Sequence, residues 1–365
     1  MVDLERKSIE VILENQKGNG AIIACPTFPT YQYFWLRDGS FAAWAMLREG
    51  HVESCRSFLR WVGGVIAAQE ETIRKLANRP GEAVGRERWL PARYAVDGSV
   101  VGDEWPNHQI DGYGAWLWCL AEYRRTSGDE DLCRELAPSI DLTVEYLART
   151  WDQPCYDCWE ENGTRIHSST LACVYGGLAA LKAFHASPKA DGVAARVRAF
   201  LLQYTIDGRF RKHGGTDSVD ASLLWLSLPF GVVEPGHPLM EETVRHIERR
   251  LLFRGGVARY PEDTYYGGGR WLILSSWLGW YYARRGRTGE ARELLEWVAS
   301  QADTEGNLPE QVSTDVIAPS MIAPWVERWG PVARPLVWSH AMYLVLKSEL
   351  ATAERASATL HREES

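Results

Sequence analysis

The sequence predicts an all-α fold, an (α/α)6 barrel of six helical hairpins with at most short strands in its loops. Two observations predict this fold. Apolar residues recur at steps of three and four through almost all of the 365 residues, as they do in amphipathic helices. The connections between these segments alternate between short and long, which indicates antiparallel hairpins whose long loops share one face.

The predicted helices form about twelve segments, separated by Gly, Pro and Asp. In chain order they are Leu4–Leu13, Phe41–Leu47, Phe58–Ala68, Tyr113–Tyr123, Leu132–Leu147, Leu171–Phe184, Val193–Tyr204, Ser222–Leu228, Met240–Leu252, Trp271–Ala283, Ala291–Val298 and Ala333–Leu350. Only the stretches Gly208–Gly215 and Phe253–Tyr260 indicate short strands.

The long connections are polar, contain many aromatic residues and follow every odd-numbered helix. They are Gln16–Asp38, Asn78–Gln109, Trp151–Ser169, Thr205–Asp220, Leu252–Arg270 and Gln301–Pro331. Every second connection of an antiparallel array lies at the same end. We therefore expect these loops to form one face that carries a site. We see no linker, so we predict a single domain over residues 1–365.

The composition excludes several kinds of partner. The formal net charge is −8 without a basic block, so we expect no nucleic-acid partner. The longest apolar runs, such as Trp271–Leu274, are too short to span a bilayer, so we expect no membrane contact. The first residues lack an apolar signal segment, and the seven cysteines fit reduced thiols, which together favour a cytoplasmic location. The sequence does not indicate how many subunits the protein has.

Cysteines and tryptophans stand out in the composition. Cys155 and Cys158 form a CxxC pair without a second pair of ligands, so we expect loop cysteines and no metal. The chain contains 17 Trp, and sugar rings stack well on aromatic faces. Outside the loops, a core position is the ordinary explanation for a single Trp.

The first two long connections combine aromatic rings with hydrogen-bonding side chains. The first carries Tyr31, Trp35, Arg37 and Asp38, and the second ends with Trp105, Gln109 and Asp111. An adjacent Arg and Asp can grip vicinal hydroxyls, because one donates and the other accepts hydrogen bonds. The alternative is that Asp38 and Asp111 are simple helix caps.

Two carboxylate motifs in later connections indicate acid–base chemistry. One is Trp159-Glu160-Glu161, and the other contains Glu310 in Leu308-Pro309-Glu310-Gln311. A buried carboxyl beside an indole can keep a proton available, so we expect the ring of Trp159 beside Glu160. A second, ionised carboxyl can activate a water molecule. The alternative for each motif alone is a solvated acidic turn.

The remaining candidates lie on the same predicted face. The fifth connection carries Arg259, Tyr265 and, after three glycines, Trp271, while Trp338 precedes Ser339 and His340 at the start of the last helix. No single motif indicates a function by itself. We predict a site because all of these motifs lie on the same face of the barrel.

With these strings in order, the sequence resembles the glucoamylase/glucodextranase family of inverting α-glucoside hydrolases, glycoside hydrolase family fifteen. The resemblance runs from about Gly20 to about Leu346. It implies the same (α/α)6 barrel, no cofactor and no metal. Many members of that family carry an N-terminal β-sandwich or a starch-binding module, and we expect neither here.

The resemblance also implies roles for the site residues. Glu160 would be the general acid and Glu310 the general base, and their carboxyl groups should stand about 6.5–9.5 Å apart. Tyr31 would orient the attacking water. Arg37 and Asp38 would hold the non-reducing glucose, and Trp105 would stack near the scissile bond. Glu161 and Arg259 would contact the sugar ring around that bond.

The resemblance thus implies an inverting, exo-acting hydrolase of short α-gluco-oligosaccharides, with isomaltose-type substrates ahead of malto-oligosaccharides. Two alternatives stay open. One is an α,α-trehalase of the same family, which uses the same two carboxylates. The other is a non-catalytic carbohydrate-sensing or regulatory protein on the same fold, although such a protein has no need of both Glu160 and Glu310.

Overall fold

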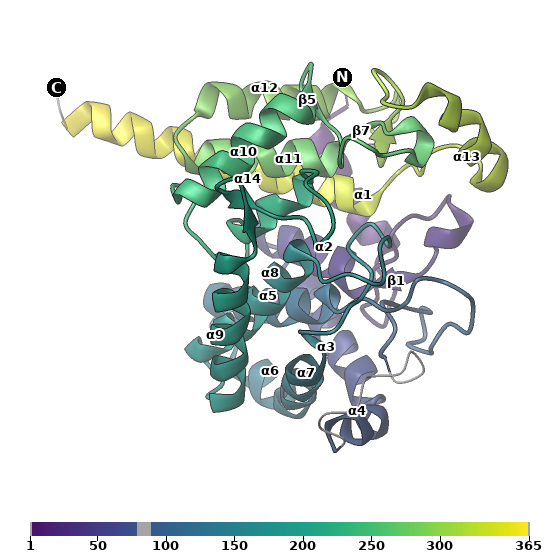
Figure 1. Cartoon of the computed structure of the whole chain (residues 1–365), viewed down its shortest axis with the longest axis vertical. Helices are drawn as coiled ribbons and strands as arrows, with labels where there is room; N and C mark the ends of the chain where they lie inside the picture. The colour runs from purple at the N-terminus through teal and green to yellow at the C-terminus, as the bar shows by residue number, and fades with distance from the viewer. Residues whose placement is uncertain (1, 79–88, 364–365) are drawn as a thin grey trace.

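The structure, a computed structural model, describes residues 2–78 and 89–363 and confirms the predicted helical barrel. Among these residues, six helical segments form an inner ring in which each segment contacts the next. The ring consists of α2 (Leu36–Arg48), α5 (Asp111–Ser127), α8 (Ser168–Ala180), the 3-10 helix η4 (Ala221–Leu226), α11 (Leu272–Arg284) and α14 (Val337–Glu363). Contacts between α14 and α2 close the ring, and the end of α14 projects from the body (Figure 1).

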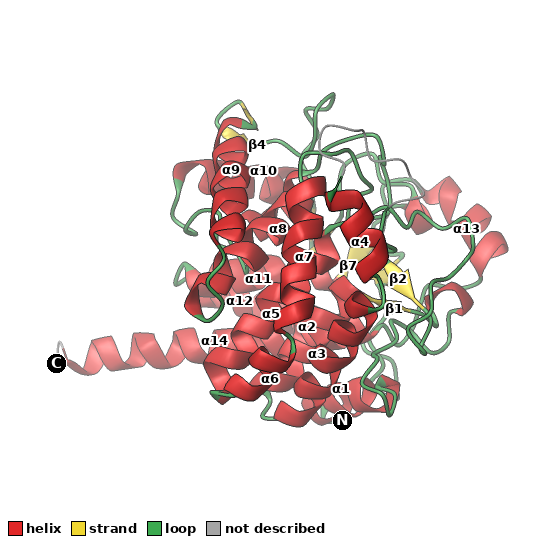
Figure 2. Ribbon diagram, turned by 90° about the horizontal axis from the view of Figure 1, so that it is seen from below, coloured by secondary structure: helices red, strands yellow, loops and turns green. Residues whose placement is uncertain are grey.

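Outer helices alternate with the inner ones along the chain and complete the hairpins. They are α1 (Leu4–Asn15), α3 (Val52–Ala67), α7 (Ala137–Thr150), α9 (Pro188–Gln203), α10 (Pro238–Arg250) and α12 (Thr288–Ser300). Each inner segment therefore begins after a long connection. Figure 2 shows these loops gathered on one side of the barrel, together with β1, β2, β7 and α13. Part of the second long connection, residues 79–88, lies outside the described residues.

Three short helices were not predicted as separate elements: α4 (Glu70–Ala77), α6 (Glu130–Glu135) and α13 (Ile322–Trp329). The predicted helix Leu132–Leu147 is divided between α6 and α7, because Pro138 in the first turn of α7 cannot donate a backbone hydrogen bond to a preceding turn. The predicted helix Ser222–Leu228 is the 3-10 helix η4, which ends before Pro229 for the same reason.

Short strands connect the loops at the site end. β3 (Thr205–Ile206) pairs with β4 (Arg209–Phe210), and β5 (Leu252–Phe253) pairs with β6 (Gly256–Val257), close to the predicted strands. Three pairings were not predicted. β1 (Phe34–Trp35) pairs with β2 (Arg93–Tyr94), and β7 (Arg270–Trp271) joins β6 to β8 (Gln311–Val312). Segments of two residues carry no periodicity that a sequence could reveal.

Aromatic side chains fill the centre of the inner ring. The ring of Phe41 lies 5.6 Å from Trp225 and 5.4 Å from Trp338, and Trp277 lies 4.9 Å from Trp225 and 5.5 Å from Trp338. These residues come from α2, η4, α11 and α14. They pack the interior solidly, so a cavity at the loop end cannot continue through the barrel.

Glycines allow α5 and α8 to pack closely. A Cβ atom at Gly114 would lie 2.3 Å from the carbonyl oxygen of Cys173, and one at Gly177 would lie 2.2 Å from that of Gly114. Both positions face backbone, which cannot rotate away as a side chain can.

We predict that Gly114→Ala lowers the free energy of unfolding by about 1–3 kcal/mol, because the added methyl group forces the two helices apart. Urea denaturation measures the change. The matched control is Gly64→Ala in α3, where a Cβ atom meets nothing within 4 Å. That variant should gain about 0.5–1 kcal/mol from helix propensity. Equal effects of the two substitutions would contradict the close packing.

Candidate active site

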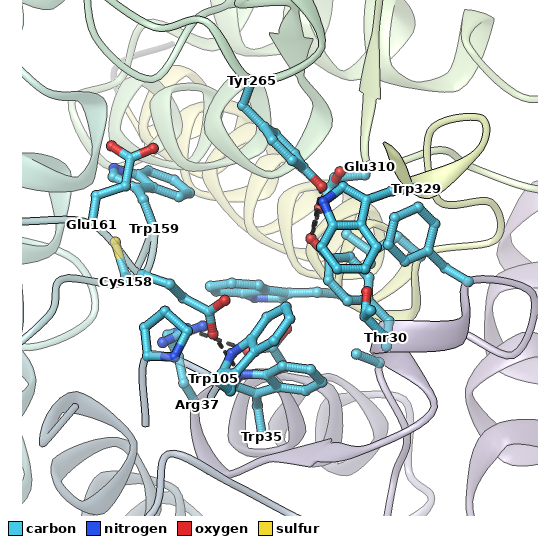
Figure 3. Close-up of a pocket in the computed structure, with 18 of the residues that line it drawn as sticks. Thr30, Trp35, Arg37, Trp105, Cys158, Trp159, Glu161, Tyr265, Glu310 and Trp329 are labelled. Carbon is cyan, nitrogen blue, oxygen red and sulfur yellow. Dashed lines mark hydrogen bonds and ion pairs between the residues drawn. The ribbon is translucent and has the colours of Figure 1, made fainter. Parts of the chain in front are cut away.

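A cavity of about 590 Å³ opens at the loop end of the barrel (Figure 3). All of the predicted site residues line it, except Gln109 and Asp111. In the close-up, Trp159 and Glu161 stand on one side, Tyr265 and Glu310 stand on the other, and Trp35 and Trp105 lie between them. The cavity has the size of small-molecule sites, which measure about 300–1,000 Å³.

Arg37 and Asp38 lie in the first turn of α2, at the inner end of the cavity. The guanidinium of Arg37 is 3.3 Å from Asp38 through Nε, and its Nη1 donates to Asp111 Oδ2 at 3.0 Å. Burial raises the pKa of Asp38 to about 6, although Arg37 opposes this shift. Asp38 Oδ2 is the oxygen of this ion pair, and it accepts no further hydrogen bond from the described residues.

Gln109 and Asp111 correct a sequence prediction, because they stand behind the cavity wall and not in it. Both are almost fully buried. Gln109 accepts a hydrogen bond from Arg37 at 2.8 Å and donates to Glu160 Oε1 at 3.2 Å. A buried guanidinium needs acceptors on several sides, so these polar side chains orient Arg37 and Glu160 and do not face a ligand.

The loop that carries Glu160 is held in an unusual backbone conformation by Asp157. Glu160 has φ 66°, in the left-handed region that non-glycine residues rarely adopt. Its N–H donates to the carbonyl of Asp157 at 2.9 Å. The side-chain Oδ1 of Asp157 accepts from the N–H groups of Trp159 and Glu161 at 3.0 and 2.9 Å. These bonds offset the strain and fix the direction of the Glu160 side chain.

The indole that donates a hydrogen bond to Glu160 is that of Trp35, not that of Trp159. Trp35 Nε1 donates to Glu160 Oε1 at 2.8 Å. Trp159 turns its own Nε1 to Asp220, at 3.1 and 3.0 Å from the two carboxylate oxygens. Trp159, the indole expected beside Glu160, therefore gives its N–H to a different carboxylate.

Glu161 belongs to a second charged group on the same side of the cavity. Arg259 Nη2 donates to Glu161 Oε1 at 3.1 Å, while Arg259 Nε donates to Asp263 Oδ2 at 2.8 Å. The hydroxyl of Tyr260 donates to the other oxygen of Glu161. Arg259 is almost fully buried, and the neighbouring carboxylates raise its pKa against the effect of burial. Glu161 is therefore held as a hydrogen-bond acceptor at the cavity edge.

Glu310 is positioned by the strands across the cavity. β8 follows it directly, and its own N–H donates to the carbonyl of Ala333 at 3.0 Å. Its Oε1 accepts from the hydroxyl of Tyr31 at 3.0 Å, and Tyr31 lies 3.0 Å from the hydroxyl of Tyr265. Glu310 Oε2 has no partner among the described residues. Burial raises the pKa of Glu310 to about 8, and the bond from Tyr31 opposes that shift.

Sequence reasoning missed several residues that shape the cavity. Three of them, Trp325, Arg328 and Trp329, come from α13 and form part of the wall. Another is Arg93, which is buried and stacks 3.9 Å from the Trp105 ring centre while it pairs with Asp103. The repeated Trp in Trp325-Val-Glu-Arg-Trp329 was the available signal. Nothing in the sequence around Arg93 marked it, because Tyr33 and Trp35, two of its aromatic partners, lie on the first long connection and Trp105 is twelve residues away.

The cysteines are not part of a metal site in the described residues. All seven are free and buried, Cys155 and Cys158 included. No group of three or more His, Cys, Asp or Glu side chains in residues 2–78 and 89–363 is arranged to hold a metal ion. Within the same ranges, we find no helix with the length and apolar character that crossing a bilayer requires.

A helical barrel with two carboxylates across a cavity rich in Trp defines a class of carbohydrate-cleaving enzymes. The chain belongs to glycosyl hydrolases family 15, which it matches over residues 5–324, and it is a glycoside hydrolase.

Several relatives support this assignment. The isomaltose glucohydrolase of Kribbella flavida is 42% identical over 95% of this chain and 92% of its own. A trehalase of Mycobacterium tuberculosis is 27% identical over 74% of this chain and 43% of its own. A solved glycosidase superimposes with a TM-score of 0.92 and 40% identity over 96% of both chains. A bacterial glucoamylase complexed with acarbose, at 17% identity and a TM-score of 0.76, covers 96% of this chain and 55% of its own, and shows the fold alone.

We predict that Tyr31→Phe raises the pKa of Glu310 further. The hydroxyl of Tyr31 stabilises the ionised carboxylate, so its loss favours the protonated form and moves the titration to higher pH. Carbon-13 NMR of labelled carboxyl groups measures the titration, with Glu310→Gln to assign the signal. The control is Tyr123→Phe, which removes a hydrogen bond to Asp129 at the other end of α5. A downward shift, or none, would contradict the assigned hydrogen bond.

Proposed function

We propose that the protein is an inverting, exo-acting α-glucoside hydrolase that releases β-glucose from the non-reducing end of short α-gluco-oligosaccharides, with isomaltose as the favoured substrate. The observation that carries the proposal is the shape of the charged cavity. Its inner end holds Arg37 and Asp38 above the packed aromatic centre, and its two sides carry Glu160 and Glu310. A closed inner end accommodates a terminal sugar but no continuing chain.

The terminal glucose would occupy the inner end, where Asp38 accepts from its outer hydroxyls. Glu160 would protonate the glycosidic oxygen as general acid, and Glu310 would deprotonate a water on the opposite ring face as general base. The free Oε2 of Glu310 suits this role, because it is the oxygen that no described side chain occupies. Glu310 acts as a base only when it is ionised, so with its pKa raised by burial to about 8 the base form is lost as the pH falls below that value.

Tyr31 would orient the attacking water, since its hydroxyl already binds Glu310. On the other side, Glu161 and Arg259 would accept and donate hydrogen bonds to the leaving sugar, and Trp105 would stack near the scissile bond. Tyr265, Trp271 and Trp338 complete the aromatic lining of the cavity. No step requires a metal or an organic cofactor.

A short substrate is favoured by the helix α13 at the cavity mouth. Its Trp325 packs 5.0 Å from the ring of Tyr265, and the hydroxyl of Tyr266 donates to Gly330 at 2.8 Å. These contacts hold α13 in place, and the helix would limit the space for sugars beyond the second one. The name of the Kribbella flavida relative favours isomaltose, and the trehalases are more distant relatives.

We predict that the protein hydrolyses isomaltose faster than maltose, trehalose or starch. Proton NMR of each reaction tests both the substrate and the mechanism, because it separates the two anomers of glucose. From an α-linked substrate β-glucose should appear first. Release of α-glucose first would exclude inversion, and faster turnover of trehalose or starch would overturn the substrate assignment.

We predict that Glu160→Gln and Glu310→Gln each lower kcat on isomaltose by about 100-fold or more, because each removes a proton-transfer group. The thermal unfolding transition should remain, since neither carboxylate holds the core together. Glu290→Gln is the control, because Glu290 pairs with Arg287 on the surface of α12. Near-normal turnover by either active-site variant would remove that residue from the mechanism.

A further inference from the structure

A buried ion pair beneath the acid loop has no part in the proposed mechanism. Lys212 Nζ lies 2.8 Å from Asp220 Oδ2, and the two residues are 5% and 0% exposed. Neither lines the cavity. Burying two charges costs several kcal/mol per ion before their attraction offsets it, so an apolar pair could serve stability equally well. The free-energy cost of burying Lys212 and Asp220 therefore indicates that the pair has a role other than stabilising the fold.

The anionic half of the pair holds the loop before Glu160. Both oxygens of Asp220 accept from Trp159 Nε1, at 3.1 and 3.0 Å, and Asp220 Oδ1 also accepts from the N–H of Ser222 at 2.8 Å. The indole of Trp159 is thereby tied to the start of η4 in the barrel ring. Since Trp159 directly precedes Glu160, its position sets where the acid loop stands over the cavity.

The cationic half reaches the other side of the same loop. Lys212 Nζ lies 3.6 Å from the ring centre of Tyr260, a cation–π contact in a desolvated setting. The hydroxyl of Tyr260 donates to Glu161, which also accepts from Arg259. Lys212 thus connects through Tyr260 to the carboxylate that faces the leaving sugar. The pair joins three long connections that are far apart in the sequence.

We propose that Lys212 and Asp220 are positioning residues for the leaving-group half of the active site, acting on Glu160 through Trp159 and on Glu161 through Tyr260. The proposal rests on the function proposed above. The glucose-binding half has supports of its own in Asp111, Tyr31 and β8, and Gln109 links it to Glu160 by bonding both Arg37 and Glu160.

The two halves can be separated by the choice of substrate. Isomaltose needs a proton for its leaving oxygen and a site for its leaving sugar. α-Glucosyl fluoride has the same glucose ring, but fluoride departs without a sugar and with little need of an acid. Hydrolysis of the fluoride therefore reports the half with Asp38 and Glu310, whereas hydrolysis of isomaltose reports both halves.

The test variant is K212M/D220N, in which both charges are removed together and Asn can still accept from Trp159. We expect kcat/KM on isomaltose to fall about 100-fold, the size of effect that a small misplacement of catalytic groups produces. On α-glucosyl fluoride it should change by less than about threefold, because the glucose-binding half is intact. If the double variant does not fold, K212Q/D220N removes the same two charges, leaves two side chains that can hydrogen-bond each other, and gives the same ratio test.

The matched control is R48M/E349Q, which removes an ion pair of 2.8 Å between α2 and α14 at the other end of α2. It should lower thermal stability without changing the ratio of the two substrates. Equal losses on both substrates in K212M/D220N, or unchanged isomaltose activity in the folded variant, would overturn the proposal. A wild-type protein that hydrolyses neither substrate would instead overturn the proposed function.

Discussion

Buried cations, each shared between a hidden carboxylate and a cavity carboxylate, fix the site end of the barrel. Arg37 binds Asp111 behind the wall and stands beside Asp38 in the cavity. Arg259 repeats this arrangement with Asp263 behind and Glu161 in front. Removing one partner of such a group would leave an uncompensated charge in a dry environment, which costs more than the pair contributes. The cavity carboxylates Asp38 and Glu161 are therefore held in fixed directions without a ligand.

Glu310 differs from these carboxylates, and the difference suits a base. Its hydrogen-bond donor is the neutral hydroxyl of Tyr31, and burial therefore raises its pKa to about 8. A carboxylate paired with a buried arginine would be ionised but weakly basic. Arg259 lowers the pKa of Glu310 only from a distance and donates to other carboxylates. The site thus separates charges that must stay ionised from the one that must take up a proton.

Much of this arrangement was predictable from the sequence because its causes are local. Helical periodicity indicates the hairpins, and alternating connections indicate the face on which Arg37 and Glu310 meet. The direction of a side chain has other causes. Trp35 donates its indole N–H to Glu160 whereas Trp159 donates its own to Asp220, and no sequence pattern carries that information. Helix α13 escaped prediction because it has only eight residues and none of them is buried, although Ile322, Trp325 and Trp329 recur at helical spacing.

The two halves of the site rest on supports of different stiffness. Arg37 and Asp38 belong to the first turn of α2, an inner helix packed on both sides in the ring. Glu160 and Glu161 belong to a loop whose N–H groups donate to Asp157, while the side chain of Glu160 accepts from Trp35 and Gln109. A helix tolerates few changes of geometry, whereas a loop can change direction with its partners. In the proposed mechanism, recognition of the terminal glucose would therefore depend on the barrel, and the choice of linkage would depend on the loops and the buried residues beneath them.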